Sequence, residues 1–318
     1  MPAGFALDWW SFGLGLGLPV AFFAGRGLAA ALRGRAAPDE APRGLKVVIT
    51  GGSRGLGYAL ADRFLALGDS VVLASRSAEG VAQAERSLRQ KHPAGEVHSM
   101  AVDVAQAEQQ DALARLCVEK FGRLDIWVAN AALSQGEKLD IADMPPEAIA
   151  SAVATNLTGS IFSARAAMKV MRQQPEGGKL FLVDGTGAWG NATPGNVAYG
   201  ATKRGLTQLV KSLEAETKKS CPQVKVHICS PGMMVTDLLK ASGAGNLRAL
   251  KFFNILAELP NTTADWLVPR MRGVTGTGKY FKFLTPLGVA YRFATAASRK
   301  NRFFDIDKLA AEQAKKQL

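Results

Sequence analysis

The feature of this sequence that most limits its fold is a short apolar run followed by a glycine-rich turn and a helical pattern. Leu45–Thr50 reads LKVVIT, Thr50–Gly57 reads TGGSRGLG, and the helical spacing of YALADRFLAL follows. Gly51, Gly55 and Gly57 are spaced so that the turn can close tightly and its backbone N–H groups can approach a pyrophosphate. A strand, a glycine turn and a helix in this order therefore predict a dinucleotide site.

The alternation of apolar runs with helical patterns continues along the chain. Helical patterns lie between the runs, including a long one from about Pro146 to Met171. Further strands are expected at residues 71–75, 97–104, 124–130, 179–183 and 224–228. Because these strands are of the buried type, the pattern predicts an α/β fold, namely a Rossmann-type doubly wound parallel sheet with helices on both faces.

The first 43 residues form a separate piece, an apolar segment and a linker. Trp9–Gly25 is an uncharged apolar run at the short limit for a membrane span, and Arg26, Arg33 and Arg35 follow it. No basic region precedes the run, so a secretory signal is not expected. The sequence leaves two alternatives open: the run spans or lies on a membrane, or it is a packed arm or a disordered leader.

The charge of the chain indicates an anionic partner. The net charge is +12, and Trp266–Phe304 contains no Asp or Glu. An anionic membrane surface or a phosphorylated ligand would suit this excess, whereas no nucleic-acid-binding motif accompanies it, so nucleic acid is not expected. The basic residues of this stretch are Arg270, Arg272, Lys279, Lys282, Arg292, Arg299, Lys300 and Arg302.

The cysteines and histidines give no sign of a disulfide framework or a metal site. Cys117, Cys221 and Cys229 are odd in number and lack C-x-x-C spacing, and the three histidines lack the spacing of metal ligands. We therefore expect a reducing compartment and no structural metal.

The end of the second strand predicts which dinucleotide binds. An Asp or Glu at this place binds the 2′-hydroxyl of NAD, but Ala74–Ser77 reads ASRS and no acid occurs before Glu79. Arg76 and Arg54 are both placed to bind a 2′-phosphate, to which guanidinium groups form forked, charge-assisted hydrogen bonds. We therefore expect NADP, and NADPH as the working cofactor, rather than NAD.

Tyr199 and Lys203 are four residues apart and lie on one face of a predicted helix. A tyrosine hydroxyl with an ordinary pKa of about 10 is a poor acid–base catalyst at neutral pH. A lysine charge at about 4 Å, with an effective dielectric constant of about 20, favours the phenolate by roughly 4 kcal/mol, or about three pKa units. We therefore expect Lys203 to lower the pKa of Tyr199 toward 7, so that Tyr199 can protonate a carbonyl oxygen.

These motifs together resemble the short-chain dehydrogenase/reductase family. The resemblance rests on TGGSRGLG, on ANAA and on the pair Tyr199–Lys203, and it covers roughly Leu45–Leu284. Ala132 stands where the family usually has glycine. The resemblance implies that Asn156 joins a proton relay and that Asp103 lies on the adenine side. The expected cofactor-binding residues are Thr50, Gly51, Ser53, Arg54, Gly55, Leu56, Gly57, Ser75, Arg76, Asp103, Asn130, Ala131, Tyr199, Lys203, Pro231, Gly232, Met234 and Thr236.

The stretch before Tyr199 departs from the family pattern. The family has a serine about a dozen residues before the tyrosine, which holds the substrate oxygen, but no serine lies between Asp184 and Tyr199. Thr186, thirteen residues before Tyr199, is our candidate for an equivalent hydroxyl. The alternative is that Thr186 is only a turn residue between two glycines.

Longer stretches resemble the chlorophyll b reductases of plants and algae. They are LVDGTGAWGNATP, AYGATKRG, SPGMMVTDLL, FFNILAELP, LVPRMR and FLTP. Those enzymes reduce the 7-formyl group of chlorophyll b or chlorophyllide b to 7-hydroxymethyl chlorophyll a. The resemblance implies an NADP-binding reductase domain at residues 44–318, with a substrate insert at about 237–275 and a basic tail at about 285–318.

The same resemblance implies a location and partners. We expect the stromal side of the thylakoid membrane in the chloroplast, with light-harvesting pigment–protein complexes as partners, and a homo-oligomer or a complex with a related reductase. No transit peptide is visible, so this location requires that one was removed or omitted. Two other functions stay open: a membrane-associated reductase of a steroid, retinoid or sphingoid ketone, and a non-catalytic NADP-binding scaffold.

Overall fold

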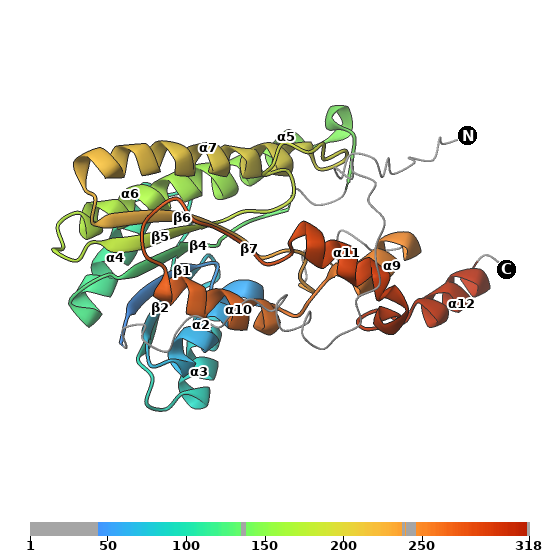
Figure 1. The fold of residues 1–318 in the computed structure, drawn as a ribbon, viewed down its shortest axis with the longest axis horizontal. Helices are drawn as coiled ribbons and strands as arrows, with labels where there is room; N and C mark the ends of the chain where they lie inside the picture. Colours follow the sequence, from blue (N-terminus) through green and yellow to red (C-terminus); the bar gives the residue numbers. More distant parts are fainter. Residues whose placement is uncertain (1–43, 135–137, 237–238, 240–245, 317–318) are drawn as a thin grey trace.

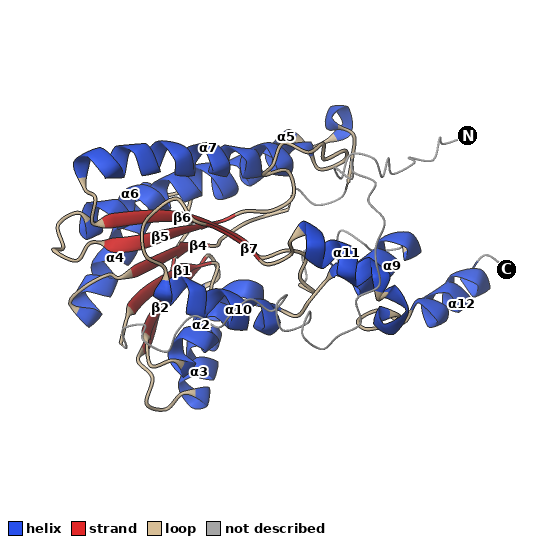
Figure 2. Cartoon of the chain, in the orientation of Figure 1, coloured by secondary structure: helices blue, strands red, loops and turns tan. Residues whose placement is uncertain are grey.

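The computed structural model describes residues 44–134, 138–236, 239 and 246–316. These residues form one sheet of seven parallel strands with helices on both faces (Figures 1 and 2). The strand order is β3-β2-β1-β4-β5-β6-β7, which confirms the expected doubly wound α/β fold. The order reverses between β1 and β4, and ligands of such sheets bind beyond the carboxyl ends of the strands at this point. The apolar run Trp9–Gly25 lies outside the described residues.

Six of the seven strands were expected from their apolar runs. The strands are β1 (Lys46–Thr50), β2 (Ser70–Ser75), β3 (Val97–Ala101), β4 (Ile126–Ala129), β5 (Gly178–Val183), β6 (Val224–Ser230) and β7 (Tyr280–Lys282). Strand β7 was not expected, because its three residues are aromatic and basic and do not form an apolar run. Tyr280 pairs with Ile228 of β6, so β7 extends the parallel sheet at its edge.

The described helices alternate with the strands in the first two thirds of the chain and follow one another in the last third. They are α2 (Gly55–Ala66), α3 (Ala78–Lys91), α4 (Ala107–Phe121), α5 (Pro146–Val153), α6 (Gly159–Met171), α7 (Val197–Ser220), α9 (Leu247–Leu256), α10 (Pro260–Gly273), α11 (Pro286–Ala294) and α12 (Ile306–Lys316). Short turns are η2 (Ile141–Asp143), η3 (Ala154–Thr158) and η4 (Ala296–Arg299). The long helix expected from Pro146 to Met171 is interrupted by η3, which is a π-helical turn.

The core has one layer on each face of the sheet. Alternate residues of a strand point to opposite faces, so Val47 and Ile49 of β1 pack with α2, α3 and α10, whereas Val48 packs with α4 and α6. Helix α10 packs against α2, and its Arg272 Nε donates to Asp69 Oδ2 at 2.8 Å. The part of the expected insert from Pro260 onward thus covers the sheet as part of the main body.

A third, smaller cluster lies beyond the carboxyl ends of the strands, where Figure 1 shows α9, α11 and α12 side by side. Leu250 and Phe253 of α9 are buried there with Ala257 and Ile306. No helix among the described residues is long and apolar enough to cross a membrane.

Candidate active site

The glycine-rich turn after β1 is shaped so that only glycine fits at key positions. Gly51 and Gly55 have φ values of 66° and 57°, in the left-handed region that favours glycine. A Cβ atom on Gly57 would lie 2.2 Å from the carbonyl oxygen of Gly51, and one on Gly51 would lie 2.9 Å from the Cα of Ala131. The turn is therefore a backbone cradle at the start of α2, which is the geometry that a pyrophosphate requires.

Side chains from β1 and β4 brace this cradle. Thr50 Oγ1 accepts hydrogen bonds from the N–H groups of Asn130 and Ala131 at 3.1 and 3.2 Å. The Asn130 side chain in turn donates to the carbonyl oxygens of Thr50 and Gly51 at 3.0 and 3.2 Å. These contacts satisfy polar groups where the sheet order reverses, so Thr50 and Asn130 fix the shape of the turn.

The edge of the cradle toward β2 offers positive charge and no carboxylate. Arg54 and Arg76 are both exposed, and no acidic side chain lies between Ser75 and Ser77. The Ser77 hydroxyl accepts from the N–H of Gly80 and caps α3. Asp103 is half-buried, and its carboxylate accepts from the N–H of Ala105 at 3.0 Å. The residues present therefore fit a dinucleotide that carries a 2′-phosphate.

Helix α7 places Tyr199 and Lys203 against the carboxyl end of β5. Tyr199 is 9% exposed and Lys203 is 2% exposed. Lys203 Nζ donates to the carbonyl oxygen of Val183 at 3.0 Å and lies 5.5 Å from the centroid of the Tyr199 ring. A Cβ atom on Gly185 would lie 2.3 Å from the Tyr199 hydroxyl, so the phenol rests directly on the glycine backbone. The expected pair is thus assembled on one helix face and closed in by the sheet.

The expected lowering of the Tyr199 pKa is wrong for this structure. Burial raises the pKa of Tyr199 above its ordinary value, and the charge of Asp184 raises it further. Burial also lowers the pKa of Lys203 to about 8, although the Asp184 charge acts in the opposite direction. The attraction of the lysine is outweighed by desolvation, which disfavours both charged forms. Tyr199 is therefore a neutral phenol, the form that donates a proton.

Asn156 lies in the π-helical turn η3 and is completely buried. Its Oδ1 accepts from the N–H of Leu133 at 2.7 Å, and its Nδ2 donates to the carbonyl oxygen of Leu133 at 2.9 Å and to Thr202 Oγ1 at 3.3 Å. Thr202 Oγ1 donates to the carbonyl oxygen of Tyr199 at 2.6 Å. Asn156 therefore ties the segment after β4 to α7, the helix that carries Tyr199 and Lys203. A relay role for it stays a prediction.

Thr186 and Trp189 lie on the loop between β5 and α7 and are both exposed. The loop is packed closely on α7, because a Cβ atom on Gly187 would lie 2.6 Å from the Cα of Gly200. Thr186 follows Gly185, which touches the Tyr199 hydroxyl, so the threonine is next to the reacting end of the site. We name Asn156, Tyr199 and Lys203 the floor of the site. Its rim is the exposed part beyond the carboxyl ends of the strands, namely Thr186, Trp189 and helix α11 (Figure 1).

Asp184 belongs to this site, and the sequence analysis did not place it there. The side chain is 4% exposed, and its Oδ2 accepts from the Tyr280 hydroxyl at 2.8 Å. Burial raises the pKa of Asp184 to about 6, and the neighbouring hydroxyl groups of Tyr280 and Ser230 act against this rise. The sequence signal that could have identified Asp184 as a site residue is its position as an acidic residue at the carboxyl end of a buried strand.

The segment Pro231–Thr236 lies across the glycine turn, since Thr236 Cγ2 is 3.4 Å from the place of a Cβ atom on Gly55. Its backbone pairs with Glu258: the Glu258 N–H donates to the Met233 carbonyl oxygen at 3.0 Å, and the Val235 N–H donates to the Glu258 carbonyl oxygen at 2.9 Å. This places Thr236 against the glycine turn, and a cofactor-binding role of Pro231, Gly232 and Met234 stays a prediction. Contact with a nicotinamide stays a prediction.

The basic stretch between Trp266 and Phe304 is largely turned toward the protein. Arg292, Arg299 and Arg302 bind the Glu258 carboxylate at 3.2, 2.7 and 2.8 Å. The guanidinium group of Arg270 lies 4.1 Å from the centroid of the Trp266 ring. Arg272 pairs with Asp69. These side chains therefore bind groups of the protein itself, whereas the sequence indicated an external anionic partner for them.

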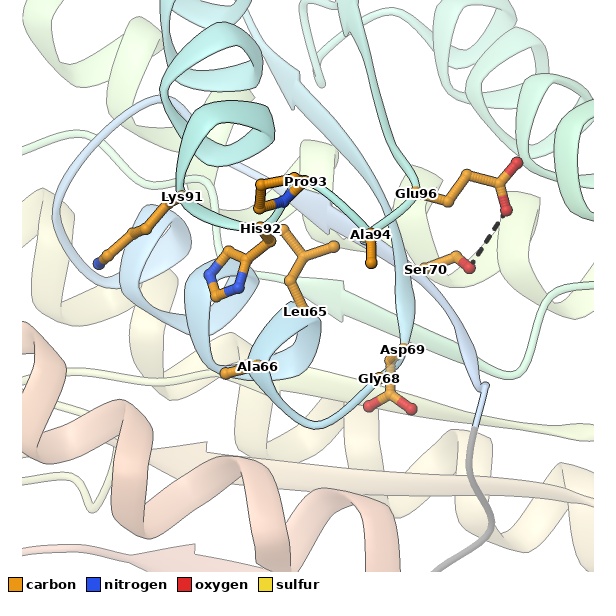
Figure 3. Close-up of a pocket in the computed structure, with 11 residues that line it drawn as sticks. Leu65, Ala66, Gly68, Asp69, Ser70, Lys91, His92, Pro93, Ala94 and Glu96 are labelled. Atoms are coloured by element: carbon orange, nitrogen blue, oxygen red, sulfur yellow. Dashed lines mark hydrogen bonds between the residues drawn. The ribbon is translucent and has the colours of Figure 1, made fainter.

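A hollow of about 500 Å³ lies at the opposite edge of the sheet, near the start of β2, and is shown in Figure 3. Its polar groups have protein partners: Ser70 Oγ donates to Glu96 Oε2 at 3.4 Å, and His92 Nε2 lies 2.7 Å from Asp62 Oδ1. It contains none of the expected site residues, so it is separate from the catalytic edge.

Comparisons with known proteins agree with this geometry. Residues 45–246 match the family of short chain dehydrogenases. The chain is 41% identical over 274 residues to the probable chlorophyll(ide) b reductase NYC1, chloroplastic, of Oryza sativa subsp. japonica. This alignment covers 81% of this chain and 53% of that protein. It is 40% identical over 265 residues to the chlorophyll(ide) b reductase NOL, chloroplastic, of the same plant, covering 81% of this chain and 77% of that protein. The chain thus spans about half the length of the first of these relatives.

Solved structures show the same fold. A short chain dehydrogenase from Burkholderia cenocepacia J2315 in complex with NADP has a TM-score of 0.64 at 23% identity, covering 76% of this chain and 97% of that one. The match to the family over residues 45–246 and the relatives near 40% identity show to which family the chain belongs. This chain belongs to the short-chain dehydrogenase/reductase family, whose members are NAD(P)-dependent oxidoreductases.

Proposed function

We propose that this chain reduces the 7-formyl group of chlorophyll b or chlorophyllide b to a hydroxymethyl group with NADPH, the first step of chlorophyll b breakdown. The observation that carries the proposal is the sequence identity of 41% and 40% to two chlorophyll(ide) b reductases, in each case over 81% of the chain. The buried Tyr199–Lys203 pair at the carboxyl edge supplies the acid–base chemistry that a carbonyl reduction needs.

The residues of the floor have distinct roles in this reduction. A bound NADPH would supply a hydride to the formyl carbon, and the formyl oxygen would then need a proton. Tyr199 is a neutral phenol, so it donates that proton as negative charge develops on the oxygen. Lys203 lies beneath the phenol and stabilises the phenolate that remains. Thr186 is our candidate for holding the oxygen, because it is exposed and follows the glycine that touches the phenol.

Arg54 and Arg76 support NADPH as the working cofactor. Both are exposed at the edge of the cradle where the 2′-phosphate would lie, and no carboxylate stands at the end of β2. A carboxylate there would repel the phosphate, whereas guanidinium groups bind it through charge-assisted hydrogen bonds.

The location and partners follow from the same relatives. Both carry the word chloroplastic in their names, which supports a chloroplast location for this chain. Light-harvesting pigment–protein complexes are the source of the substrate in this proposal, and the thylakoid membrane is the surface on which the chain works. Association with a second copy or with a related reductase remains part of the proposal.

An absorption spectrum tests the substrate. The protein is mixed with NADPH and chlorophyllide b, or with chlorophyll b in detergent, and the Soret band of the b-type pigment should move to the blue as the formyl group is reduced. Matched reactions contain a steroid ketone or a sphingoid ketone in place of the pigment. A steady pigment spectrum with rapid NADPH oxidation on a ketone would overturn the proposal in favour of another lipid carbonyl. NADPH binding without any turnover would indicate a scaffold.

A further inference from the structure

Asp184 lies between two residues that touch the catalytic pair. The carbonyl oxygen of the preceding Val183 accepts the hydrogen bond from Lys203 Nζ at 3.0 Å. The following Gly185 lies against both partners, because a Cβ atom there would be 2.3 Å from the Tyr199 hydroxyl and 3.4 Å from Lys203 Cε. The carboxylate therefore belongs to the chain segment on which the pair rests.

The carboxylate is only partly satisfied by hydrogen bonds. Its Oδ2 accepts from the Tyr280 hydroxyl at 2.8 Å, and Trp189 Nε1 donates to the same hydroxyl at 2.9 Å. Its Oδ1 is buried and has no hydrogen-bond partner among the described residues. Several neighbouring groups and this carboxylate influence each other's pKa values. They are Tyr199 and Lys203 of α7, Cys229 and Ser230 of β6, and Tyr280 and Lys282 of β7.

Lys203 needs a negative charge nearby to stay protonated. Its ammonium group is almost fully buried, and burial without a counter-charge disfavours the charged form of a lysine. The Asp184 charge is the influence that raises the pKa of Lys203 against the effect of burial, and the resulting pKa is about 8. The pKa of Asp184 is about 6, so between these two values the carboxylate and the ammonium are both charged.

We propose that Asp184 is a positioning residue for the reduction: its buried carboxylate is the counter-ion that keeps Lys203 an ammonium ion beneath Tyr199. This inference rests on the proposed reductase activity, but it does not depend on which carbonyl compound is the substrate. Asp184 itself touches neither the reacting oxygen nor the cofactor in this role and acts through the lysine.

The test measures the protonation of Lys203 directly, without turnover. Protein with carbon-13 in its lysine Cε atoms is titrated by NMR, and the Lys203 resonance is assigned by its loss in Lys203→Met. In Asp184→Asn the titration midpoint of Lys203 should fall by roughly one pH unit or more, because a nearby opposite charge has been removed. A midpoint that stays within about 0.3 units of the parent would overturn the proposal, since the expected shift is roughly one unit.

Two further variants separate a charge effect from a packing effect. Tyr280→Phe removes the hydrogen bond to Oδ2 but leaves the charge, so the Lys203 midpoint should stay near the parent value. Asp125→Asn makes the same substitution at a buried aspartate at the start of β4, on the other edge of the sheet, and should also leave the midpoint unchanged. A shift in either variant as large as that in Asp184→Asn would show a structural role and overturn the proposal.

Two measurements keep the inference separate from the proposed function. In the parent protein, the Lys203 resonance should show a second inflection near pH 6 as Asp184 becomes protonated, and its absence would overturn the proposal even if Asp184→Asn does not fold. With any carbonyl substrate that the parent reduces, the alkaline limb of kcat in Asp184→Asn should move to lower pH with the NMR midpoint. If the parent reduces no b-type pigment, the proposed substrate fails while the NMR test of Asp184 stands.

Discussion

At the floor of the site, Asn156, Tyr199 and Lys203 are 0%, 9% and 2% exposed, whereas at the rim Trp189 is 58% exposed and Leu287 of α11 is 74% exposed. The floor side chains of Asn156 and Lys203 bond to backbone groups of neighbouring segments, so their positions follow from the sheet. Helix α11 has no buried residue and packs on α9 through few side chains, such as the pair Phe252–Phe293 with ring centroids 5.9 Å apart.

This difference in exposure suggests that the floor carries out the proton transfer and that the rim selects the substrate. A buried floor attached to a rigid sheet keeps the proton donor in one place, whichever carbonyl compound enters. An exposed rim on loops and a surface helix can differ between relatives without disturbing the core. We therefore expect changes at the floor to reduce activity toward every substrate, and changes at the rim to act on one substrate or one step.

The largest effect should come from Tyr199→Phe at the floor. Loss of the proton donor should lower kcat by about 100- to 10,000-fold for every carbonyl substrate, because general acid catalysis contributes factors of this size. NADPH binding, measured by quenching of protein fluorescence, should change little. Turnover within tenfold of the parent would show that Tyr199 is not the proton donor.

The second effect concerns the stability of the cluster behind the rim. Glu258→Ala leaves Arg292, Arg299 and Arg302 without their shared carboxylate and should lower the free energy of unfolding by about 3 kcal/mol, as breaking a buried ion pair does. Urea denaturation measures this change. Asp265→Ala is the control, because its pair with Arg63 is exposed and should contribute at most about 1 kcal/mol. Equal losses of unfolding free energy in both variants would contradict the greater contribution that we expect from the Glu258 ion pairs.

The same carboxylate predicts a dependence of stability on pH. Hydrogen bonds and charges of the arginines hold the pKa of Glu258 below its ordinary value despite burial. A carboxyl whose pKa is lowered in the folded state contributes stability above its unfolded pKa, and this contribution is lost as the pH falls through the folded pKa. The parent should therefore be more stable than Glu258→Gln at neutral pH. This difference in unfolding free energy should shrink as the pH falls below the ordinary pKa of a glutamate side chain.

Arg76→Asp at the cofactor edge should have a smaller effect, confined to cofactor choice. Removing one charge-assisted contact and adding a repelling carboxylate should lower the preference for NADPH over NADH by about 10- to 100-fold. The ratio of kcat/KM for the two cofactors measures it. Arg86→Asp makes the same charge change on an exposed site of α3 and should leave the ratio unchanged. A parent enzyme that uses both cofactors equally would refute the phosphate-binding role.

Thr186→Val at the rim should have the smallest effect. The hydroxyl is exposed, so water can replace part of its hydrogen bond to the substrate oxygen, and kcat should fall by about tenfold rather than by the larger factors seen for enclosed oxyanion donors. KM for the substrate should change less than kcat. Thr193→Val nearby on the same loop is the matched control. An unchanged kcat would make Thr186 a turn residue only.

The sequence predicted the parts of the molecule that depend on local pattern. Six parallel strands were visible because strands buried on both faces are continuous apolar runs. Tyr199 and Lys203 were visible because four residues make one helical turn. Two of the three floor residues were therefore predictable from local pattern, and Asn156 was expected from the family resemblance. Asp184 was not placed beside them, because its significance depends on the fold that buries it.

The remaining features depend on contacts between distant residues. The three-residue β7 pairs with the edge of β6, and the Asn156 side chain in the π-helical turn binds Leu133, which lies 23 residues earlier in the chain. The arginines near the C-terminus indicated an external anionic partner, but the fold places the Glu258 carboxylate among them. Desolvation also reversed the expected direction of the Tyr199 pKa, and no local pattern carries the degree of burial.

The packing of α10 on α2 has a consequence for biosynthesis. Asp69 and Arg272, which join the two helices, are 203 residues apart. At about 5–20 residues per second, the ribosome takes roughly 10–40 s to add the residues that separate them. During that interval the face of α2 that α10 later covers has no packing partner, so its apolar side chains are available for aggregation. Translation speed between these two residues thus sets how long the unfinished protein is open to aggregation.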